Sequence, residues 1–306
     1  MEKRCFLFEG QGTQHTGMGK QIYSMFPEAK EVFDIGSEVT KLDLKKLCFE
    51  TEFDELSKTD KAQLAVFTVS MAVYNVLKAK DKIPDIFAGF SLGECSALCA
   101  AGVFALTDAF LIVKKRGELM HRCALNKKGA MYAIIGLEDS CTEEICSETK
   151  GYVIPVNYNC PYQLVIAGDD KSVGTAAQRC LEKGAKRAVR LAVEGAFHSR
   201  HMAKAASEFR QFLTMFKSVA PIGEVYSNIY GDRLTDFSHL NDYLAGHMLS
   251  PVRWKREIAC IKNSHNDVIF YEIGCGNTLT QFNRRIDKNI TTKNLSTTDS
   301  VLEVLG

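Results

Sequence analysis

The sequence predicts an α/β fold in which a parallel, helix-covered sheet carries a small inserted subdomain. Apolar strand-like segments alternate with helix-like segments up to residue 126 and again from residue 195, an order typical of parallel sheets. Between these parts the signals become compact and follow the order β-α-β-β-α-β. The 306 residues, 46% of them hydrophobic, are enough for one large core and a smaller one.

Two predicted strands in the first part each end in a glycine-containing loop. Cys5–Phe8 leads into residues 9–14, and Asp85–Ala88 leads into residues 89–93. Glycines suit loops whose backbone N–H groups point outward. The predicted helices of this part are Met18–Met25, Gln63–Leu77, Glu94–Ala101 and Asp108–Cys123.

The predicted insertion spans residues 127–194, about 65 residues, which is enough for a small subdomain. Its element order is that of the ferredoxin-like arrangement. We therefore divide the chain into a large subdomain, residues 1–126 and 195–306, and a small one, residues 127–194. The strands expected in the small subdomain are Ala130–Ile135, Tyr152–Asn157, Gln163–Ala167 and Arg187–Val193, and its helices are Cys141–Thr149 and Ser172–Lys183.

Strands and helices alternate again after the insertion. Pro251 limits one of these helices, because the residue before a proline is pushed out of the helical region. The expected elements are the helices Met202–Phe216, Leu240–Met248 and Leu279–Ile286 and the strands Val225–Ile229 and Val268–Ile273.

Charge and cysteine content limit the kinds of partner. The 38 basic and 37 acidic residues nearly cancel, so the net charge gives no reason to expect nucleic acid or an anionic membrane surface. Eleven cysteines without a C-x-x-C motif indicate free, mostly buried thiols in a reducing compartment. Because no apolar run suits a signal sequence or a membrane span, we expect a cytoplasmic protein.

Ser91 is the first candidate catalytic residue. It is the centre of a Gly-x-Ser-x-Gly pattern, residues 89–93, between an apolar strand and an alanine-rich helix. That context forces a serine into strained backbone and exposes its hydroxyl as a nucleophile. The pattern alone is weak evidence, since short motifs arise by chance. The flanking elements strengthen it, and the sequence predicts covalent catalysis through Ser91.

His198 is the candidate base. A serine hydroxyl must lose its proton near neutral pH, and histidine has a suitable pKa. His198 lies in a Gly-Ala-Phe-His loop at the C-terminal edge of a predicted strand, where open α/β sheets place ligand crevices. An ordinary loop histidine is the alternative. We expect ordinary surface histidines at His15, His121, His201, His239 and His265, which lie in predicted loops or on polar helix faces.

Arg116 allows two interpretations. A Lys-Lys-Arg run on a helix usually forms a solvated face. However, Gly117 is unfavourable inside a helix, which suggests that another part of the chain approaches the backbone there. An arginine can bind a carboxylate through two hydrogen bonds, so Arg116 could select an acidic acyl group.

Six short motifs are spaced along the chain: Gly10-Gln11-Gly12-x-Gln14, Gly89-Phe90-Ser91-Leu92-Gly93-Glu94, Arg116-Gly117-x-x-Met120, Ala196-Phe197-His198-Ser199, Ser250-Pro251-Val252-x-Trp254 and Gly274-x-Gly276-x-x-Leu279. In order and spacing, over nearly the whole chain, they resemble those of the malonyl-CoA:acyl-carrier-protein transacylases. The resemblance implies an acyltransferase with an α/β-hydrolase-like core. The Gly-Ala-Phe-His-Ser and Lys-Arg-Gly-Glu-Leu-Met forms are similar to the free-standing, trans-acting acyltransferases that serve polyketide synthases.

The resemblance also implies roles for particular residues. Ser91 matches the nucleophile that receives the malonyl group, and His198 matches its base. Gln11 and Leu92 match the positions whose backbone N–H groups form the oxyanion hole. Arg116 matches the residue that pairs with the malonyl carboxylate, and the main-chain carbonyl of His247 matches the group that orients the base.

Four further positions, Phe90, Phe197, Gln63 and Asn159, match the acyl pocket or its surroundings. Phe197 would narrow the pocket where an α-methyl branch would lie, which predicts malonyl over methylmalonyl. The chain departs from the family pattern at Phe90, where histidine is usual, and at Glu9 and Cys275, where proline is usual. The departure at Phe90 leaves the effect on acyl selectivity open, and those at Glu9 and Cys275 are expected to be changes of scaffold.

The implied mechanism is ping-pong. Malonyl-CoA acylates Ser91, coenzyme A leaves, and the phosphopantetheine thiol of an acyl carrier protein takes the acyl group. No metal and no permanently bound cofactor are expected. Two alternatives stay open, an acyl hydrolase that clears carrier proteins and a non-catalytic docking module. The sequence does not distinguish a fatty-acid from a polyketide carrier, and it does not give the docking surface or the oligomeric state.

Overall fold

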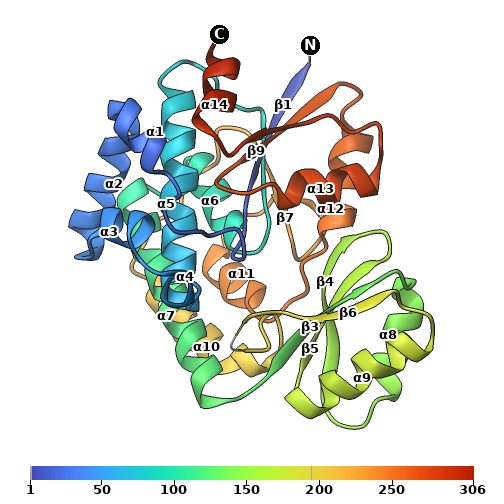
Figure 1. Ribbon diagram of the computed structural model, residues 1–306. Coiled ribbons are helices and arrows are strands. Elements are labelled where there is room, and N and C mark those ends of the chain that lie inside the picture. Colours follow the sequence, from blue (N-terminus) through green and yellow to red (C-terminus); the bar gives the residue numbers. More distant parts are fainter. Residues whose placement is uncertain (1, 194) are drawn as a thin grey trace.

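The computed structural model describes residues 2–193 and 195–306 and contains two sheets (Figure 1). The larger sheet has the order β10-β9-β1-β2-β7-β8. Its first five strands pair in parallel, and β8 pairs antiparallel with β7. The strands are β1 (Lys3–Phe8), β2 (Ile86–Gly89), β7 (Glu224–Ser227), β8 (Asp232–Arg233), β9 (Val268–Ile273) and β10 (Thr292–Leu295).

Helices surround the larger sheet and bury its central strands. The N-terminal half contributes α1 (Lys20–Met25), α2 (Pro27–Thr40), α3 (Leu44–Phe49), α4 (Phe53–Leu56), α5 (Thr59–Lys78), α6 (Leu92–Ala100) and α7 (Leu106–Asn126). The C-terminal half contributes α10 (Ala203–Leu213), α11 (Leu240–His247), α12 (Trp254–Ser264), α13 (Thr278–Ile286) and α14 (Thr298–Leu305). Helix α5 is apolar on most of its surface and almost wholly buried, so it forms the centre of this core.

The smaller sheet is antiparallel, with the order β4-β5-β3-β6. Its elements are β3 (Ala130–Ile135), α8 (Asp139–Glu148), β4 (Val153–Cys160), β5 (Gln163–Gly168), α9 (Asp170–Glu182) and β6 (Arg187–Arg190). The two helices bury a separate apolar cluster against this sheet. The β-α-β-β-α-β order predicted from the sequence is confirmed by these elements. Residue 194, the predicted end of the small subdomain, lies outside the described residues.

Backbone hydrogen bonds join the small sheet to the segment before α12. The N–H of Tyr158 donates to the carbonyl of Val252 at 2.8 Å, and the N–H of Val252 donates to the carbonyl of Val156 at 2.8 Å. The edge strand β4 thereby continues onto the large part of the molecule, beside the loop that contains Ser250. Both sheets therefore contribute to one shared region.

Several predicted boundaries differ from the structure. The expected helix Met202–Phe216 is a 3₁₀ turn, Arg200–Met202, followed by α10, which ends at Leu213. The expected strand Arg187–Val193 ends at Arg190. Helices α2, α3, α4, α12 and α14 and strands β8 and β10 were not predicted. Two of these helices have a local signal in the sequence. Pro27 stands at the first turn of α2, and the Asp43 side chain caps α3 by accepting from the N–H of Lys46.

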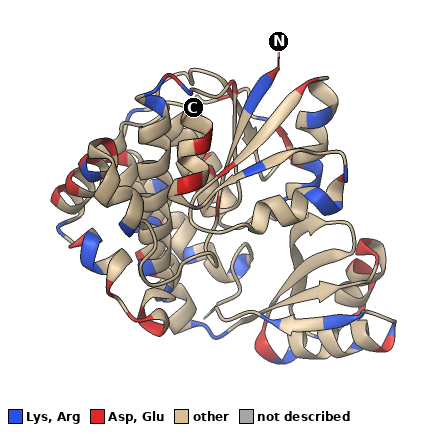
Figure 2. Cartoon of the chain, turned by 45° about the horizontal axis from the view of Figure 1, so that its top comes forward, with Lys and Arg blue, Asp and Glu red and all other residues tan. Residues whose placement is uncertain are grey.

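The surface and the cysteines agree with a mixed-charge protein whose thiols are free. Basic and acidic residues are interspersed over the outer helices (Figure 2). All eleven cysteines are free, and only Cys141 and Cys260 are partly exposed, which confirms the expectation of mostly buried thiols. Among the described residues, no helix is both long enough and apolar enough to span a membrane.

Candidate active site

Ser91 lies between β2 and α6 in strained backbone. Its φ of 54° and ψ of −106° are outside the usual regions for a residue with a side chain. Gly89 and Gly93 permit the turn, because a Cβ at Gly89 would lie 2.0 Å from the carbonyl oxygen of Gly93, and one at Gly93 equally close to that of Phe8. The two glycines let strand and helix pack directly against each other. The serine side chain is left partly exposed at the turn.

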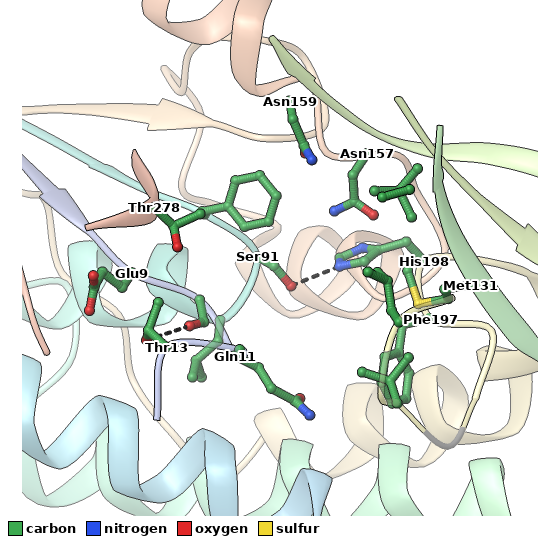
Figure 3. A pocket seen from close by; sticks show the side chains of 18 of the residues that line it. Glu9, Gln11, Thr13, Ser91, Met131, Asn157, Asn159, Phe197, His198 and Thr278 are labelled. Atoms are coloured by element: carbon green, nitrogen blue, oxygen red, sulfur yellow. Dashed lines mark hydrogen bonds between the residues drawn. The ribbon is translucent and has the colours of Figure 1, made fainter. Parts of the chain in front are cut away.

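The Ser91 hydroxyl faces the imidazole of His198, with 2.7 Å between Oγ and Nε2 (Figure 3). Nδ1 of the same ring lies 3.0 Å from the carbonyl oxygens of both His247 and Ser250. Carbonyl oxygens only accept, so Nδ1 carries the proton and Nε2 offers its lone pair to the serine. The structure therefore places the carbonyl of His247 where the sequence predicted it, and adds that of Ser250.

Burial determines the protonation state of His198, which is only 3% exposed. Burial is the largest cause that lowers the pKa of His198 to about 4, and the charge of Arg116 lowers it further. The two carbonyls at Nδ1 oppose this shift. The ring is therefore neutral near pH 7, which is the form that can accept a proton from Ser91.

Arg116 is buried in the same place, and the interpretation of a solvated face is wrong for it. The residue is 1% exposed; Nη1 donates to Oε1 of Gln63 at 2.7 Å, and Nη2 is 3.4 Å from Oγ of Ser91. Within the described residues its Nε has no acceptor, and no carboxylate forms an ion pair with it. Burial lowers the pKa of Arg116. A buried guanidinium with unused donors can bind an incoming carboxylate.

Gly117 explains how α7 can place that arginine. A Cβ at Gly117 would lie 3.1 Å from the Cα of Asp60, at the start of α5. The close approach of another segment at this glycine, predicted from the sequence, is confirmed. Because α5 and α7 pack closely here, Gln63 and Arg116 face each other.

Two backbone N–H groups near Ser91 are available. In the described part of the chain, the N–H groups of Gln11 and Leu92 have no protein acceptor. Leu92 is the first residue of α6, so its N–H belongs to the positive end of that helix. Gln11 lies in the loop after β1, where Gly12 has a φ of 111°. Such N–H groups can stabilise a developing negative charge on oxygen.

A cavity of about 250 Å³ connects these groups. Of the predicted site residues, only His247 does not line it; that residue lies behind His198. Asn157 and Asn159 line the cavity from β4, and Phe197 and Met131 line it as well (Figure 3). The other predicted residues that line the cavity are Gln11, Gln63, Phe90, Ser91, Leu92, Arg116 and His198.

The predicted pocket residues differ in their environment. Phe90 packs edge-on against Trp254, with ring centroids 5.7 Å apart, and fills the wall beside the serine. Asn159 is 4% exposed, and its Oδ1 has no hydrogen-bond partner among the described residues. Oδ1 of Asn157 likewise has no hydrogen-bond partner among the described residues, and the sequence analysis did not predict Asn157 as a site residue. These two amides can bind polar groups of a ligand that enters between the two sheets.

Asn228 is the main residue that the sequence analysis missed. Its Oδ1 accepts the N–H of Ser91 at 2.7 Å and lies 3.2 Å from Nε2 of His247. Its Nδ2 donates to the carbonyl of Gly89 at 2.7 Å and to Oε2 of Glu257 at 2.8 Å. One fully buried amide therefore holds the nucleophile turn from behind. Its only sequence signal is a polar residue directly after the strand β7.

The expected surface position is wrong for His201, which is buried, with its Nε2 2.9 Å from Oδ1 of Asp169. Its ring stacks on Tyr152 at a centroid distance of 5.4 Å. The 3₁₀ turn after His198 directs this side chain under the small sheet. His201 thus joins the two parts of the molecule and does not face the cavity.

In the described ranges, no cluster of three or more His, Cys, Asp or Glu residues could hold a metal ion.

The comparisons with known proteins agree with this geometry. Residues 5–298 match the acyl transferase domain family. The chain is 36% identical over 304 residues to the malonyl CoA-acyl carrier protein transacylase of Bacillus subtilis (strain 168), covering 98% of this chain and 96% of the relative. It is also 36% identical, over 291 residues, to the polyketide biosynthesis malonyl CoA-acyl carrier protein transacylase PksC of the same organism, covering 93% and 97%.

A solved structure extends the likeness to the fold. It contains PlMCAT, a malonyl-transacylase in complex with AntF, a holo acyl-carrier protein of a type II polyketide synthase. The TM-score is 0.95 at 33% identity, covering 99% of each chain. The fold and the Ser91–His198 site therefore define an acyltransferase of the acyl transferase domain family. Within that family, the chain belongs to the malonyl-CoA:acyl-carrier-protein transacylases.

Proposed function

We propose that this enzyme transfers a malonyl group from malonyl-CoA, through an ester on Ser91, to the phosphopantetheine thiol of an acyl carrier protein. The observation that carries the proposal is the 2.7 Å contact between Oγ of Ser91 and the unprotonated Nε2 of His198. The names of the relatives support the substrate and the acceptor. The relative solved with its carrier protein supports this kind of partner.

The first half-reaction follows from the contacts. Nε2 of His198 accepts the Ser91 proton while Oγ attacks the thioester carbonyl of malonyl-CoA. The oxyanion that forms accepts hydrogen bonds from the N–H groups of Gln11 and Leu92. As the C–S bond breaks, His198 returns the proton to the departing sulfur, so coenzyme A leaves as a thiol. The second half-reaction runs the same steps in reverse, with the carrier thiol as the attacking group.

Arg116 selects the acyl group in this proposal. Its guanidinium can bind the free malonyl carboxylate through two parallel hydrogen bonds, and Gln63 fixes its orientation at 2.7 Å. Burial strengthens this pairing, because water competes weakly there. Phe197, 6% exposed beside His198, limits the space for a branch on the acyl carbon.

We propose the α/β-hydrolase-like description for the large part of the chain and the ferredoxin-like description for the small one. The strand, turn, helix arrangement at Ser91 supports the first description, and the antiparallel order β4-β5-β3-β6 supports the second. The boundaries we propose are residues 1–126 with 195–306, and 127–194.

The eleven free cysteines support a reducing, cytoplasmic location. The free-standing, trans-acting polyketide role has support in the PksC likeness.

Intact-mass spectrometry tests the proposal. The protein is mixed separately with malonyl-, methylmalonyl- and acetyl-CoA, and then with a holo acyl carrier protein. We expect a malonyl adduct on the wild type, no adduct on Ser91→Ala, and transfer of the adduct to the carrier. Free malonate without malonyl carrier would show a hydrolase, and a wild type that forms no adduct would show a non-catalytic module.

A further inference from the structure

Glu9 is a buried carboxyl residue that the proposed mechanism does not use. It directly follows β1, two residues before Gln11, and it is 0% exposed. Its Oε2 accepts the N–H of Cys275 at 2.7 Å, and its Oε1 accepts the N–H of Gly276 at 2.8 Å. The side chain points away from Ser91 (Figure 3). Glu9 therefore binds backbone rather than substrate.

The loop at residues 274–276 is shaped around this carboxyl group. A Cβ at Gly274 would lie 2.1 Å from Oε2 of Glu9, and one at Gly276 would lie 2.8 Å from its Oε1. Gly274 also has a φ of 154°. Glu9 thus leaves no room for a Cβ at Gly274, and Glu9 and Thr13 together leave none at Gly276. The Cys275 N–H is equally required, because a proline at this position could not donate.

A second contact supports the same loop from the other side. Sγ of Cys275 lies 3.5 Å from the carbonyl oxygen of Thr13, whose hydroxyl donates to the carbonyl of Gly10 at 3.2 Å. Residues 9–13 therefore rest on residues 274–276 at both ends. Gln11 is in the middle of this supported segment and lines the cavity, and its N–H has no acceptor among the described residues.

The charges around Glu9 consist of one more carboxyl group and one thiol. Glu272 faces it from β9, and Cys275 faces it from the loop that follows β9. Within the described residues, no lysine, arginine or histidine forms an ion pair with Glu9. Glu272 accepts the N–H groups of Leu279 and Thr280 at 2.7 and 2.8 Å. The neighbouring carboxyl group of Glu272 disfavours the ionised form of Glu9.

We infer that Glu9 is a positioning residue: its carboxyl group holds the backbone of Cys275 and Gly276 and so fixes the loop that presents the N–H of Gln11. This inference rests on the proposed role of Gln11 as an oxyanion donor. Burial, and after it the charge of Glu272, raises the pKa of Glu9 to about 8. Glu9 is therefore mainly neutral at pH 7. Above about pH 8 it acquires a negative charge two residues from the donor that must stabilise an oxyanion.

Four variants separate positioning from simple stability. Glu9→Gln imitates the neutral acid, because one amide oxygen in the place of Oε2 can still accept from the N–H groups of both Cys275 and Gly276, which lie 2.7 and 2.9 Å from Oε2. Glu9→Leu removes the acceptor. Cys275→Pro removes the N–H, and Cys275→Ala keeps it as the matched control. The measurements are the rate of malonyl adduct formation on Ser91 in single turnover, the dependence of that rate on malonyl-CoA concentration, and its dependence on pH.

We expect Glu9→Leu and Cys275→Pro to slow the maximal acylation rate by roughly tenfold or more. This is less than the roughly hundredfold to thousandfold slowing expected when an oxyanion donor is removed, because these variants misplace the Gln11 N–H and do not delete it. The malonyl-CoA concentration for half-maximal rate should change less than about twofold, since substrate binding does not use Glu9. Cys275→Ala and, at pH 7, Glu9→Gln should stay within about threefold of wild type. The wild-type rate should fall above pH 8, and Glu9→Gln should not show this fall.

The outcomes distinguish this inference from the proposed function. A malonyl adduct that forms on Ser91 at the wild-type rate in Glu9→Leu and Cys275→Pro would overturn the inference and leave the proposed function intact. The same alkaline fall in wild type and Glu9→Gln would also overturn it. Absence of any adduct in the wild type would instead refute the proposed function. If Glu9→Leu does not fold, the pH profile of Glu9→Gln still decides.

Discussion

The backbone N–H of Ser91 donates to Oδ1 of Asn228 at 2.7 Å, although 137 residues separate the two in sequence. The same side chain donates to the carbonyl of Gly89, on the other side of the strained turn. Besides His247, two buried carboxyl groups contact Asn228. Oε2 of Glu94 accepts the N–H of Asn228 at 2.9 Å, and Glu257 accepts from its Nδ2. The turn at Ser91 is thus held by a residue that does not touch the substrate cavity.

Replacing Asn228 with alanine should lower the free energy of unfolding by about 2–4 kcal/mol. The substitution removes the partner of the half-buried Ser91 N–H and that of a buried Glu257 oxygen, and each lost partner costs about 1–3 kcal/mol. Urea denaturation at pH 7 measures the loss. Asn75→Ala is the control, because Asn75 donates one hydrogen bond, to the carbonyl of Glu28 at 2.9 Å, at a half-buried site. Equal losses in the two variants would contradict the special role of Asn228.

The sequence predicted those parts of the site that local pattern encodes. Ser91 follows from glycines two residues away on each side, whose effect on the turn is local. Gly117 likewise indicated a close approach that the structure shows at Asp60. Asn228 and the carbonyl of Ser250 have no comparable local signal, because their roles depend on which strands become neighbours. The sheet order that brings β7 beside β2 is a tertiary property.

The fold shows the same division. The β-α-β-β-α-β order was visible because each element is short and well separated by turns. Helix α12 was missed although Trp254, Ile258 and Ile261 form one buried stripe, since its polar residues interrupt the apolar pattern. His201 was placed at the surface for a related reason. Its burial depends on Tyr152 and Asp169, which lie directly before β4 and directly after β5 of the small sheet.

The pH dependence of Ser91 acylation should report the depressed pKa of His198. The neutral ring is the base, and burial lowers its pKa from 6.5 to about 4. The acylation rate should therefore stay level as pH falls from 7 to about 5 and halve only near 4. Rapid-mixing measurements of adduct formation with malonyl-CoA give this profile. A midpoint near 6.5 would show that the ring is not desolvated as the structure places it.

The same shift affects stability, so the exposure to acid must be short. The unfolded chain binds a proton at His198 below about pH 6.5, whereas the folded chain does not until about pH 4. The stability that the neutral His198 contributes to the folded chain is therefore lost as pH falls from about 6.5 to about 4. Returning each sample to pH 7 and measuring its acylation rate again separates unfolding from titration.

Arg116→Ala should remove the preference for malonyl over acetyl groups. Hydrogen bonds to a charged group contribute about 1.5–3 kcal/mol, so malonyl acylation should fall by between about tenfold and a hundredfold. Acetylation of Ser91 should continue, because an acetyl group has no carboxylate to bind. Competition between malonyl- and acetyl-CoA with intact-mass detection measures the ratio. Arg116→Lys keeps a charge without the planar fork and should recover only part of the preference. An unchanged ratio in Arg116→Ala would remove the reason for assigning the carboxylate to this residue.

Phe197→Ser should increase the use of methylmalonyl-CoA relative to malonyl-CoA. The ring lines the cavity next to His198, where an α-methyl branch would have to fit. Exclusion of one methyl group by a packed pocket corresponds to about 1–3 kcal/mol, so the ratio of the two acylation rates should move by roughly tenfold or more. Phe197→Leu keeps most of the apolar volume and is the matched control, which should retain the malonyl preference. The measurement is adduct formation on Ser91 from an equimolar mixture of the two thioesters. If the serine and leucine variants give the same ratio as the wild type, the steric account of acyl selectivity at this position is wrong.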